Sequence, residues 1–267
     1  MSNTQNIRER MQDHLSHFRA TCPDTEFVAL FLYGSQNYGI ATEESDVDTK
    51  LIVLPSLDDM VFNRPPMSKT LSLPNGEQCD VKDIRLMFDN YRKQNINYLE
   101  TLFTPHRILN GNYTWALNAL FEAREKIARM DEVRGVKALY GMMQQKYNML
   151  TKSSPATAAA IDKFGYDPKQ LVHIDRLNEF FHRFYRRHEP MESALLCECP
   201  EFMIEMKHGH YSKDYALGYC KDVLAGDKVL VDEFVATYTP EPNNASEIMD
   251  TVLKDIITTK LRGDLTE

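Results

Sequence analysis

Two aspartates separated by one residue, Asp46 and Asp48, are the side chains of this chain best suited to chemistry. They follow an apolar run that ends in Gly34 and Ser35, with ten residues between Ser35 and Asp46. In an extended strand, residues two apart lie on one face, so the two carboxylates would lie side by side while Val47 points the other way. Neighbouring carboxylates repel each other unless a cation lies between them, and hard oxygen ligands suit Mg²⁺. The spacing therefore predicts a Mg²⁺ (or Mn²⁺) site that acts on a phosphate-bearing substrate.

A third carboxylate is expected to complete such a site and to help the attacking hydroxyl lose its proton. Glu77, Asp80 and Asp83 are the candidates. In a short strand over 78–82, Cys79 and Val81 suit the core face, which places Asp80 on the other face. Asp83 is better explained as the cap of a following helix. Asp80 is therefore the predicted third metal ligand, and an ordinary surface position in the strand is the alternative interpretation.

The bend after the first strand is predicted to contact phosphate. Gly34 allows close approach of the backbone, and the hydroxyl of Ser35 and nearby N–H groups are suitable donors. A phosphate-binding loop of the Walker type is excluded, because Ile40 and Ala41 stand where Lys and Ser/Thr are required after Gly39.

A second group of phosphate donors is predicted on a helix that begins at Pro168 with Asp167 as its cap. Lys169, His173 and Arg176 are spaced four and three apart, so they share one helical face and could bind a triphosphate or an acceptor's phosphate. An apolar stripe occupies the roughly opposite face. This leaves a second interpretation open, in which the basic stripe only faces water.

The elements that must position these residues follow from hydrophobic periodicity. The pattern predicts an amphipathic helix over 5–19, a buried strand over 27–33, strands over 46–54 and 78–82, and a helix after Asp83. From about residue 115 the periodicity is helical almost throughout. We predict an α+β fold in which a small mixed β-sheet domain with helices, residues 1–128, precedes a helical domain, residues 129–267. Trp115 is expected in or near the core.

Composition excludes several classes of protein. Of 267 residues, 43% are hydrophobic and 10% aromatic, which is too apolar for a disordered chain. The longest apolar run, 27–33, is far shorter than the roughly 18 residues of a membrane span. No basic region followed by an apolar stretch opens the chain, so we expect a cytoplasmic protein without a membrane segment.

The cysteines and the net charge exclude further classes of protein. Five scattered cysteines argue against a disulfide scaffold, and Cys197 and Cys199 lack the partners of a zinc site. The formal charge of −8 argues against a surface coated in basic patches, although a local basic groove would still bind nucleic acid.

The sequence resembles the polymerase-β-type nucleotidyltransferase superfamily, and within it the RNA-ligase-associated polymerase-β-like family. The resemblance covers most of the chain in order. The matching segments are Gly34-Ser35-Gln36-Asn37-Tyr38-Gly39, Glu44-Ser45-Asp46-Val47-Asp48, Asn97 with Leu99-Glu100 and Leu102-Phe103, Gly165-Tyr166-Asp167 with Lys169, His173 and Arg176-Leu177, and Ile204-Glu205-Met206-Lys207 with Gly209.

This resemblance implies a nucleotidyltransferase core with an appended helical domain, Mg²⁺ dependence and a nucleoside triphosphate substrate. It implies metal ligation by Asp46, Asp48 and Asp80. It also implies phosphate contacts for Gly34 and Ser35. Two positions depart from the family pattern. Thr49 stands where a hydrophobic residue is more usual, and Gln170 follows Lys169 where His is expected.

The expected reaction moves a nucleoside monophosphate from a nucleoside triphosphate to an acceptor hydroxyl and releases pyrophosphate, in a cleft between the two domains. An RNA end is the acceptor that the resemblance suggests, whereas the acidic composition would equally suit a protein hydroxyl or a small molecule. A synthase of signalling nucleotides and a non-catalytic nucleotide-binding or antitoxin-like module are the alternatives. The oligomeric state does not follow from the sequence.

Overall fold

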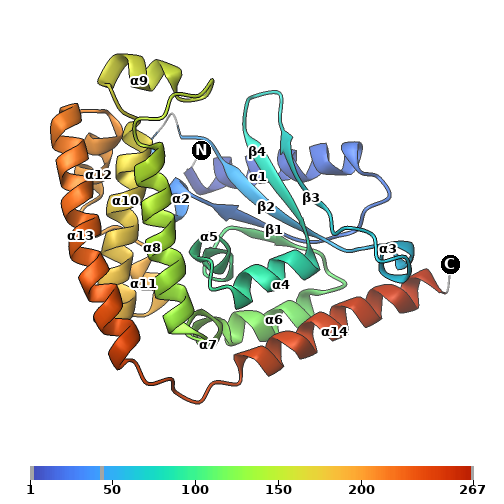
Figure 1. Cartoon of the computed structure of the whole chain (residues 1–267). Helices are drawn as coiled ribbons and strands as arrows, with labels where there is room; N and C mark the ends of the chain where they lie inside the picture. The colour runs from blue at the N-terminus through green and yellow to red at the C-terminus, as the bar shows by residue number, and fades with distance from the viewer. Residues whose placement is uncertain (1–2, 43–44, 266–267) are drawn as a thin grey trace. The chain divides into compact units, whose positions relative to one another are not determined.

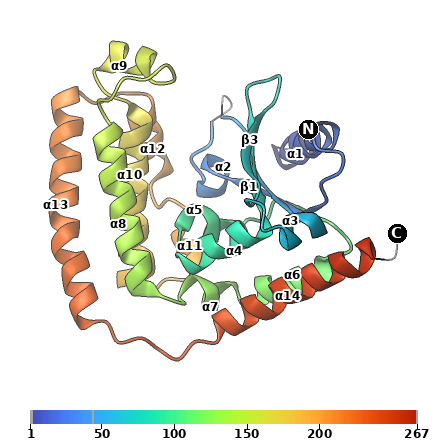
Figure 2. The same cartoon turned by 45° about the vertical axis from the view of Figure 1, so that its right-hand side comes forward.

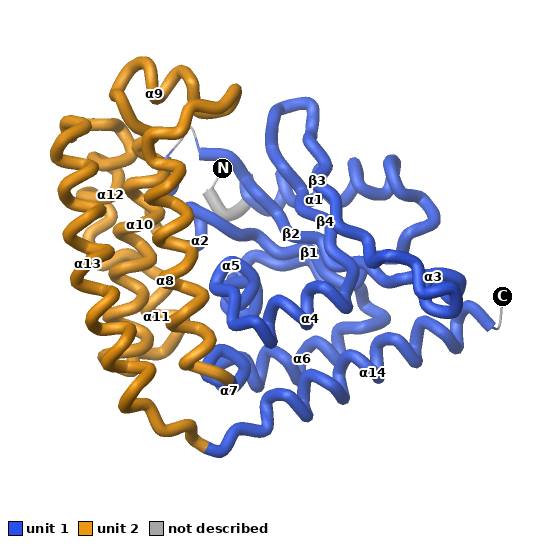
Figure 3. The backbone as a smooth tube through the Cα atoms, in the orientation of Figure 1, with its two compact units in different colours: residues 1–37, 41–130, 242–267 blue, residues 38–40, 131–241 orange. Residues whose placement is uncertain are grey.

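The computed structural model describes residues 3–42 and 45–265, and over those residues the chain combines a five-stranded sheet with many helices (Figure 1). The predicted α+β class is confirmed. The chain divides into two units (Figure 3): unit 1 comprises Met1–Asn37, Ala41–Met130 and Pro242–Glu267, and unit 2 comprises Tyr38–Ile40 and Asp131–Glu241. The change of unit after Met130 lies close to the predicted boundary at 128/129. The final segment, however, belongs with the sheet rather than with the helical unit.

The sheet of unit 1 is mixed, as the sequence predicts. Its strands are β1 (Phe27–Tyr33), β2 (Asp48–Val53), β3 (Ser68–Ser72), β4 (Gln78–Asp83) and β5 (Arg107–Leu109). Their order is β3-β4-β2-β1-β5. The pair β2–β4 is parallel, and the other neighbouring pairs are antiparallel. The first strand has the predicted bounds, whereas the second begins at Asp48 instead of Asp46.

Helix α1 (Asn3–Thr21) packs on one face of the sheet (Figure 2). Its apolar side chains recur at helical spacing, so they form one continuous stripe. Ile7, Met11, Leu15 and Phe18 are all buried, and they pack with inward-facing residues of the strands. This core gives the sheet a buried face and leaves its other face to α4 (Ile84–Arg92), which contacts β2 and β4.

Asp83 caps the start of α4: its side chain accepts from the backbone N–H of Arg85 at 2.8 Å, so the predicted cap is confirmed. The remaining helices of this part are α2 (Ser35–Tyr38), α3 (Leu57–Val61), α5 (Ile96–Leu99), η1 (Glu100–Leu102), α6 (Thr114–Glu122), α7 (Arg124–Ala128) and α14 (Ala245–Asp264). The last of these packs on α6 and α4, which ties the end of the chain to unit 1. Trp115 of α6 is 56% exposed, so the prediction of a core tryptophan is wrong.

Unit 2 is helical, as predicted. Its elements are α8 (Glu132–Met149), α9 (Ala158–Phe164), α10 (Pro168–Phe180), the π-helical segment η2 (Phe181–Arg186), α11 (Met191–Ala194), α12 (Pro200–Lys207) and α13 (Lys213–Thr237). Helix α10 is central, because it contacts α8, α12 and α13, and its Leu171, Ile174 and Leu177 are fully buried. In the described part of the chain, no helix combines the length and the apolar character that crossing a membrane requires.

Candidate functional site

The parallel pairing of β2 with β4 places Asp80 close to residues 46–48, called the acidic segment. In this register Lys50 lies opposite Asp80, and Thr49 lies opposite Cys79. Cys79 and Val81 are fully buried in the core beneath α1. Because side chains alternate along a strand, Asp80 lies on the other face, as the sequence predicts.

The two aspartates of the acidic segment avoid the α1 core. Val47 between them is fully buried in that core, whereas Asp46 is exposed and Asp48 is partly buried. Asp48 opens β2 and pairs with Tyr33 at the end of β1. The alternation therefore places Asp48 on the sheet face that carries Asp80.

The phenol of Tyr33 lies within the electric field of several carboxylates. Burial raises the pKa of its hydroxyl, and the negative charges of Asp48, Asp80 and Glu100 raise it further. The three carboxylates belong to β2, β4 and η1. Carboxylates from three separate parts of the chain thus all act on the phenol at the end of β1.

Two lysines balance the charge of Asp80. Nζ of Lys82 lies 3.0 Å from one carboxylate oxygen, and Nζ of Lys50 lies 3.4 Å from the other. The ammonium group of Lys50 also lies 3.8 Å from the ring centroid of Tyr33 and 4.6 Å from that of Tyr98. Burial lowers the pKa of Lys50, and the charge of Asp80 opposes that shift. Asp80 therefore holds cationic groups on both oxygens.

The predicted metal ligands do not form a ready-made triad. Among residues 3–42 and 45–265, no three His, Cys, Asp or Glu side chains gather closely enough to hold a metal ion. The structure brings Asp48 and Asp80 to one face, and the oxygens of Asp80 are turned to the lysines. Metal ligation by Asp46, Asp48 and Asp80 stays a prediction. Glu44 of the resembling segment lies outside the described residues.

The side chain of Glu77, another candidate for the third ligand, lies on the opposite side of the sheet, where it forms hydrogen bonds with α1 and with the acidic segment. Its Oε1 accepts from the backbone N–H of Val47 at 2.9 Å and contacts the guanidinium of Arg10 on α1. Its Oε2 accepts from Nε2 of His14 at 3.1 Å and from the amide of Asn75 at 2.8 Å. The carboxylate is only 2% exposed. Glu77 therefore anchors the acidic segment from the core side.

His14 continues this network to β2. Because a carboxylate only accepts, Nε2 of His14 carries the proton, and Nδ1 accepts from the hydroxyl of Thr49 at 2.8 Å. Burial lowers the pKa of His14 to about 4, and the charge of Arg10 adds to the shift, so the imidazole is neutral at pH 7. The hydrogen bond gives the buried hydroxyl of Thr49 a partner in the core.

The bend after β1 has the expected open backbone. Gly34 has φ +89°, and a Cβ there would meet no atom within 4 Å, so its conformation requires glycine although the space does not. Its N–H donates to Glu100 at 3.4 Å, and the same oxygen accepts from the amide of Asn37 at 3.4 Å. Glu100 is 1% exposed. A buried carboxylate thus takes the N–H predicted to contact phosphate, and phosphate contacts of Gly34 and Ser35 stay predictions.

The three basic residues of α10 differ in their exposure and in their contacts. Lys169 is exposed, His173 is partly buried, and Arg176 is 5% exposed with its guanidinium 3.9 Å from the ring centroid of Tyr38. Burial lowers the pKa of His173 to about 3, and Arg176, Lys146 and Lys169 add to the shift. The interpretation that the whole stripe faces water is therefore wrong for Arg176.

Lys146 of α8 is a member of this basic cluster that its spacing in the sequence did not reveal. Burial lowers the pKa of its ammonium group, and the neighbouring charge of Arg176 lowers it further. Nε of Arg176 is buried and has no hydrogen-bond partner within the described part of the chain. Lys146, Lys169, His173 and Arg176, together called the basic cluster, have the character of an anion site.

The start of α10 confirms its predicted cap and gives Gln170 a structural role. The side chain of Asp167 accepts from the backbone N–H of Lys169 at 3.0 Å, and Pro168 occupies the first turn. The amide of Gln170 donates to the same carboxylate at 3.0 Å. Gln170 therefore helps to hold the helix start.

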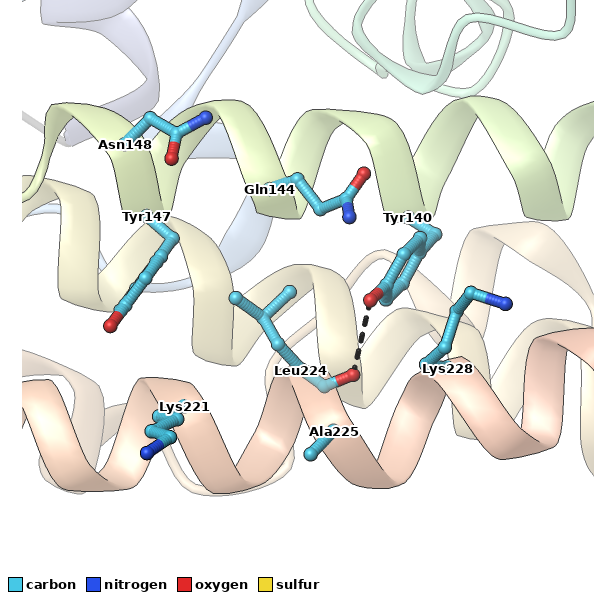
Figure 4. A pocket seen from close by; sticks show the side chains of 8 residues that line it. All are labelled: Tyr140, Gln144, Tyr147, Asn148, Lys221, Leu224, Ala225 and Lys228. Atoms are coloured by element: carbon cyan, nitrogen blue, oxygen red, sulfur yellow. Dashed lines mark hydrogen bonds between the residues drawn. The ribbon is translucent and has the colours of Figure 1, made fainter.

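A groove of about 510 Å³ lies between α8 and α13 of unit 2 (Figure 4). Tyr140 and Tyr147 line one side, Lys221 and Lys228 line the other, and the hydroxyl of Tyr140 donates to the carbonyl of Leu224 at 3.2 Å. No carboxylate, imidazole or thiol lines it. The groove therefore lacks the ligands that the predicted chemistry needs.

No protein-family model matches the chain, and comparison with curated proteins finds no match.

Proposed function

We propose that this protein is a metal-dependent nucleotidyltransferase of the polymerase-β type, which transfers a nucleoside monophosphate from a nucleoside triphosphate to an acceptor hydroxyl. One observation carries the proposal. By the register of β2 with β4, Asp80 shares a sheet face with Asp48, and Asp48 pairs with Tyr33, which directly precedes the Gly34 bend. These are the elements that the resembling superfamily uses in the same chain order.

The donor set fits a hard divalent cation. Asp46, Asp48 and Asp80 supply carboxylate oxygens only, and such ligands are typical of Mg²⁺. Asp80 pairs with the ammonium groups of Lys50 and Lys82, and a divalent cation would take the place of these cations on its oxygens. When bound there, Mg²⁺ or Mn²⁺ would neutralise phosphate charge and favour in-line displacement.

In the proposed reaction, the acceptor oxygen forms a bond to the α-phosphorus, and the bond from that phosphorus to the bridging oxygen breaks. Pyrophosphate leaves with the electron pair of that bond. Asp80 takes the proton of the acceptor hydroxyl. The hydroxyl of Ser35 holds the β- and γ-phosphates, and Gly34, which has no side chain, lets them approach the backbone of the bend. Catalysis then consists mainly of positioning and charge neutralisation.

The basic cluster of unit 2 is proposed to bind phosphate. Arg176 is held by the ring of Tyr38, and its buried Nε lacks a partner, so an anion would satisfy a donor that is otherwise left without a hydrogen bond. Lys146 and Lys169 add positive charge, while His173 is neutral and donates through one ring N–H. We therefore propose Lys169, His173 and Arg176 as nucleotide-binding residues, together with Lys146.

Label transfer tests the proposal. The protein is incubated with Mg²⁺ or Mn²⁺ and each α-labelled nucleoside triphosphate, alone and with an RNA mixture. An Asp46→Asn/Asp48→Asn variant is run in parallel. Asp46 is exposed and Asp48 partly buried, so the double substitution is expected to preserve the fold. Asp24→Asn is the control, because Asp24 is an exposed aspartate outside the site.

We expect metal-dependent label transfer by the wild type and by Asp24→Asn, and loss of transfer in the double variant. Label on RNA identifies an RNA acceptor, label on the protein identifies self-modification, and an oligonucleotide product identifies a signalling synthase. Absence of transfer under every condition would overturn the proposal and favour a nucleotide-binding module.

A further inference from the structure

We infer that Glu77 is a positioning residue, which holds Asp46 and Asp48 in place for metal binding from the opposite side of the sheet. The inference rests on the proposed function, and it adds a part of the molecule that contributes no ligand. Its basis is a set of hydrogen bonds between α1, the turn before β4 and the acidic segment.

The first step is the backbone of the acidic segment. The N–H of Val47 lies between the two aspartates in the chain, and it donates to Oε1 of Glu77 at 2.9 Å. Val47 itself is fully buried. Fixing this peptide restricts the direction in which Asp46 and Asp48 leave the backbone, because alternate residues of an extended chain point to opposite faces.

The second step is that Asp48 lies between two anchors. Val47 before it is held by Glu77, and Thr49 after it donates to Nδ1 of His14 at 2.8 Å. Both anchors act on the α1 side of the sheet. The side chain of Asp48 therefore projects from a segment that is fixed on both sides of it.

The third step is that Glu77 is itself held in one orientation. Asn75 donates to its Oε2 at 2.8 Å, His14 donates to the same oxygen at 3.1 Å, and Arg10 contacts its Oε1. The side-chain oxygen of Asn75 also accepts from the backbone N–H of Glu77 at 3.1 Å. A 2% exposed carboxylate with this many donors has no freedom to serve as a metal ligand on the other face.

Residues that orient metal ligands typically change metal affinity by about 10-fold to 100-fold when they are replaced, although they never touch the metal. Glu77→Gln keeps a side-chain oxygen of the same shape but replaces charge-assisted hydrogen bonds with weaker ones. We therefore expect the substitution to loosen the acidic segment and to weaken metal binding, while the chain still folds.

The experiment measures Mn²⁺ binding by the full chain through the loss of the free-ion electron paramagnetic resonance signal, without substrate. Glu77→Gln is expected to raise the dissociation constant by about 10-fold or more. In the transfer assay, its apparent metal constant should rise in parallel, and kcat at saturating metal should change less. Glu77→Asp, which shortens the side chain but keeps the charge, should bind metal with an intermediate affinity.

The matched control is Asp83→Asn. Asp83 ends β4, the strand that follows Glu77, and like Glu77 it is 2% exposed and binds an arginine, Arg85; its side chain caps α4 instead of binding the backbone of Val47. Asp83→Asn should destabilise the protein without weakening Mn²⁺ binding. Should Glu77→Gln fail to fold, Arg10→Met provides the second test. Arg10 is 28% exposed, and its loss should weaken Mn²⁺ binding in the same direction.

The outcomes separate the two ideas. If the wild type binds Mn²⁺ and Glu77→Gln binds it equally well, the positioning role is overturned and the proposed function stands. If Asp83→Asn weakens binding as much as Glu77→Gln does, the effect is a general loss of stability and the positioning role again fails. If the wild type neither binds Mn²⁺ nor transfers label, both ideas fail together.

Discussion

His14 should make the stability of unit 1 fall as the pH drops from 7 to 5. The side chain is fully buried, and its burial lowers its pKa from 6.5 to about 4. Arg10 and His17 favour the neutral form, Asp13 opposes it, and the adjoining Glu77 accepts from Nε2 of the neutral ring. The unfolded chain therefore binds the proton first. The contribution is fully present above about pH 6.5 and is progressively lost as the pH falls toward 4.

The size of this effect follows from proton linkage. At pH 5 an imidazole with a pKa of 6.5 in the unfolded chain is almost fully protonated, whereas one with a pKa of about 4 is mostly neutral. The difference corresponds to about 2 kcal/mol of unfolding free energy at pH 5 and to almost nothing at pH 7. Below pH 4 both states are protonated, and the loss levels off.

Urea unfolding at pH 7, 6 and 5 measures the effect, with fluorescence of Trp115 as a signal from unit 1. His14→Gln keeps a donor for Glu77 but cannot titrate. The variant should be less stable than the wild type at pH 7, and the gap should narrow by about 2 kcal/mol at pH 5. His17→Gln, the same substitution on the same helix, should follow the wild type. If the free energies of unfolding of His14→Gln and of the wild type changed equally with pH, the interpretation of His14 as a buried neutral imidazole would be refuted.

Two further predictions concern unit 2. Besides burial, the charge of Arg176 makes the largest contribution to the low pKa of His173, and Arg176→Met removes it. The pKa of His173 should therefore move from about 3 toward 6.5 in an NMR titration of the imidazole signals. An unchanged pKa would contradict the close approach of Arg176 and His173 in the basic cluster. Gly209→Ala should lower the free energy of unfolding of unit 2 by about 1 to 3 kcal/mol. The residue has φ +73°, and an added Cβ would lie 2.8 Å from Cζ of Phe164 and nearer still to two other atoms of that ring. Urea unfolding followed by circular dichroism measures the loss. Gly218→Ala, where a Cβ meets nothing within 4 Å, is the control, and equal effects of the two substitutions would count against this argument.

Features encoded by neighbouring residues could be predicted from the sequence. The apolar run that forms β1, the caps Asp83 and Asp167, and the outward direction of Asp80 all follow from local spacing, and the structure agrees with them. Each depends on the periodicity of one element or on a side chain that binds a backbone group two residues away. Such rules need no knowledge of which elements meet in space.

Contacts between distant parts of the chain could not be predicted in this way. His14 and Glu77 are 63 positions apart, and Glu77 and Val47 are 30 apart. An acidic residue in a turn has the same local pattern whether it binds metal, solvent or a buried histidine. The packing of α14 against α6 and α4 in unit 1 was not predictable either, because the periodicity of an amphipathic helix does not specify which element it packs against.

The two faces of β2 show why the acidic segment needs support from both sides. On one face Asp80 is balanced by Lys50 and Lys82, which keeps a partly buried carboxylate from being left without a cation. On the other face Glu77 is balanced by Arg10. A single strand lies between these networks, so a shift of its backbone disturbs both. If a divalent cation binds as proposed and draws Asp80 away from its lysines, it acts on a segment whose far side is already fixed. We therefore expect side chains, and not the strand, to move when such a cation is added.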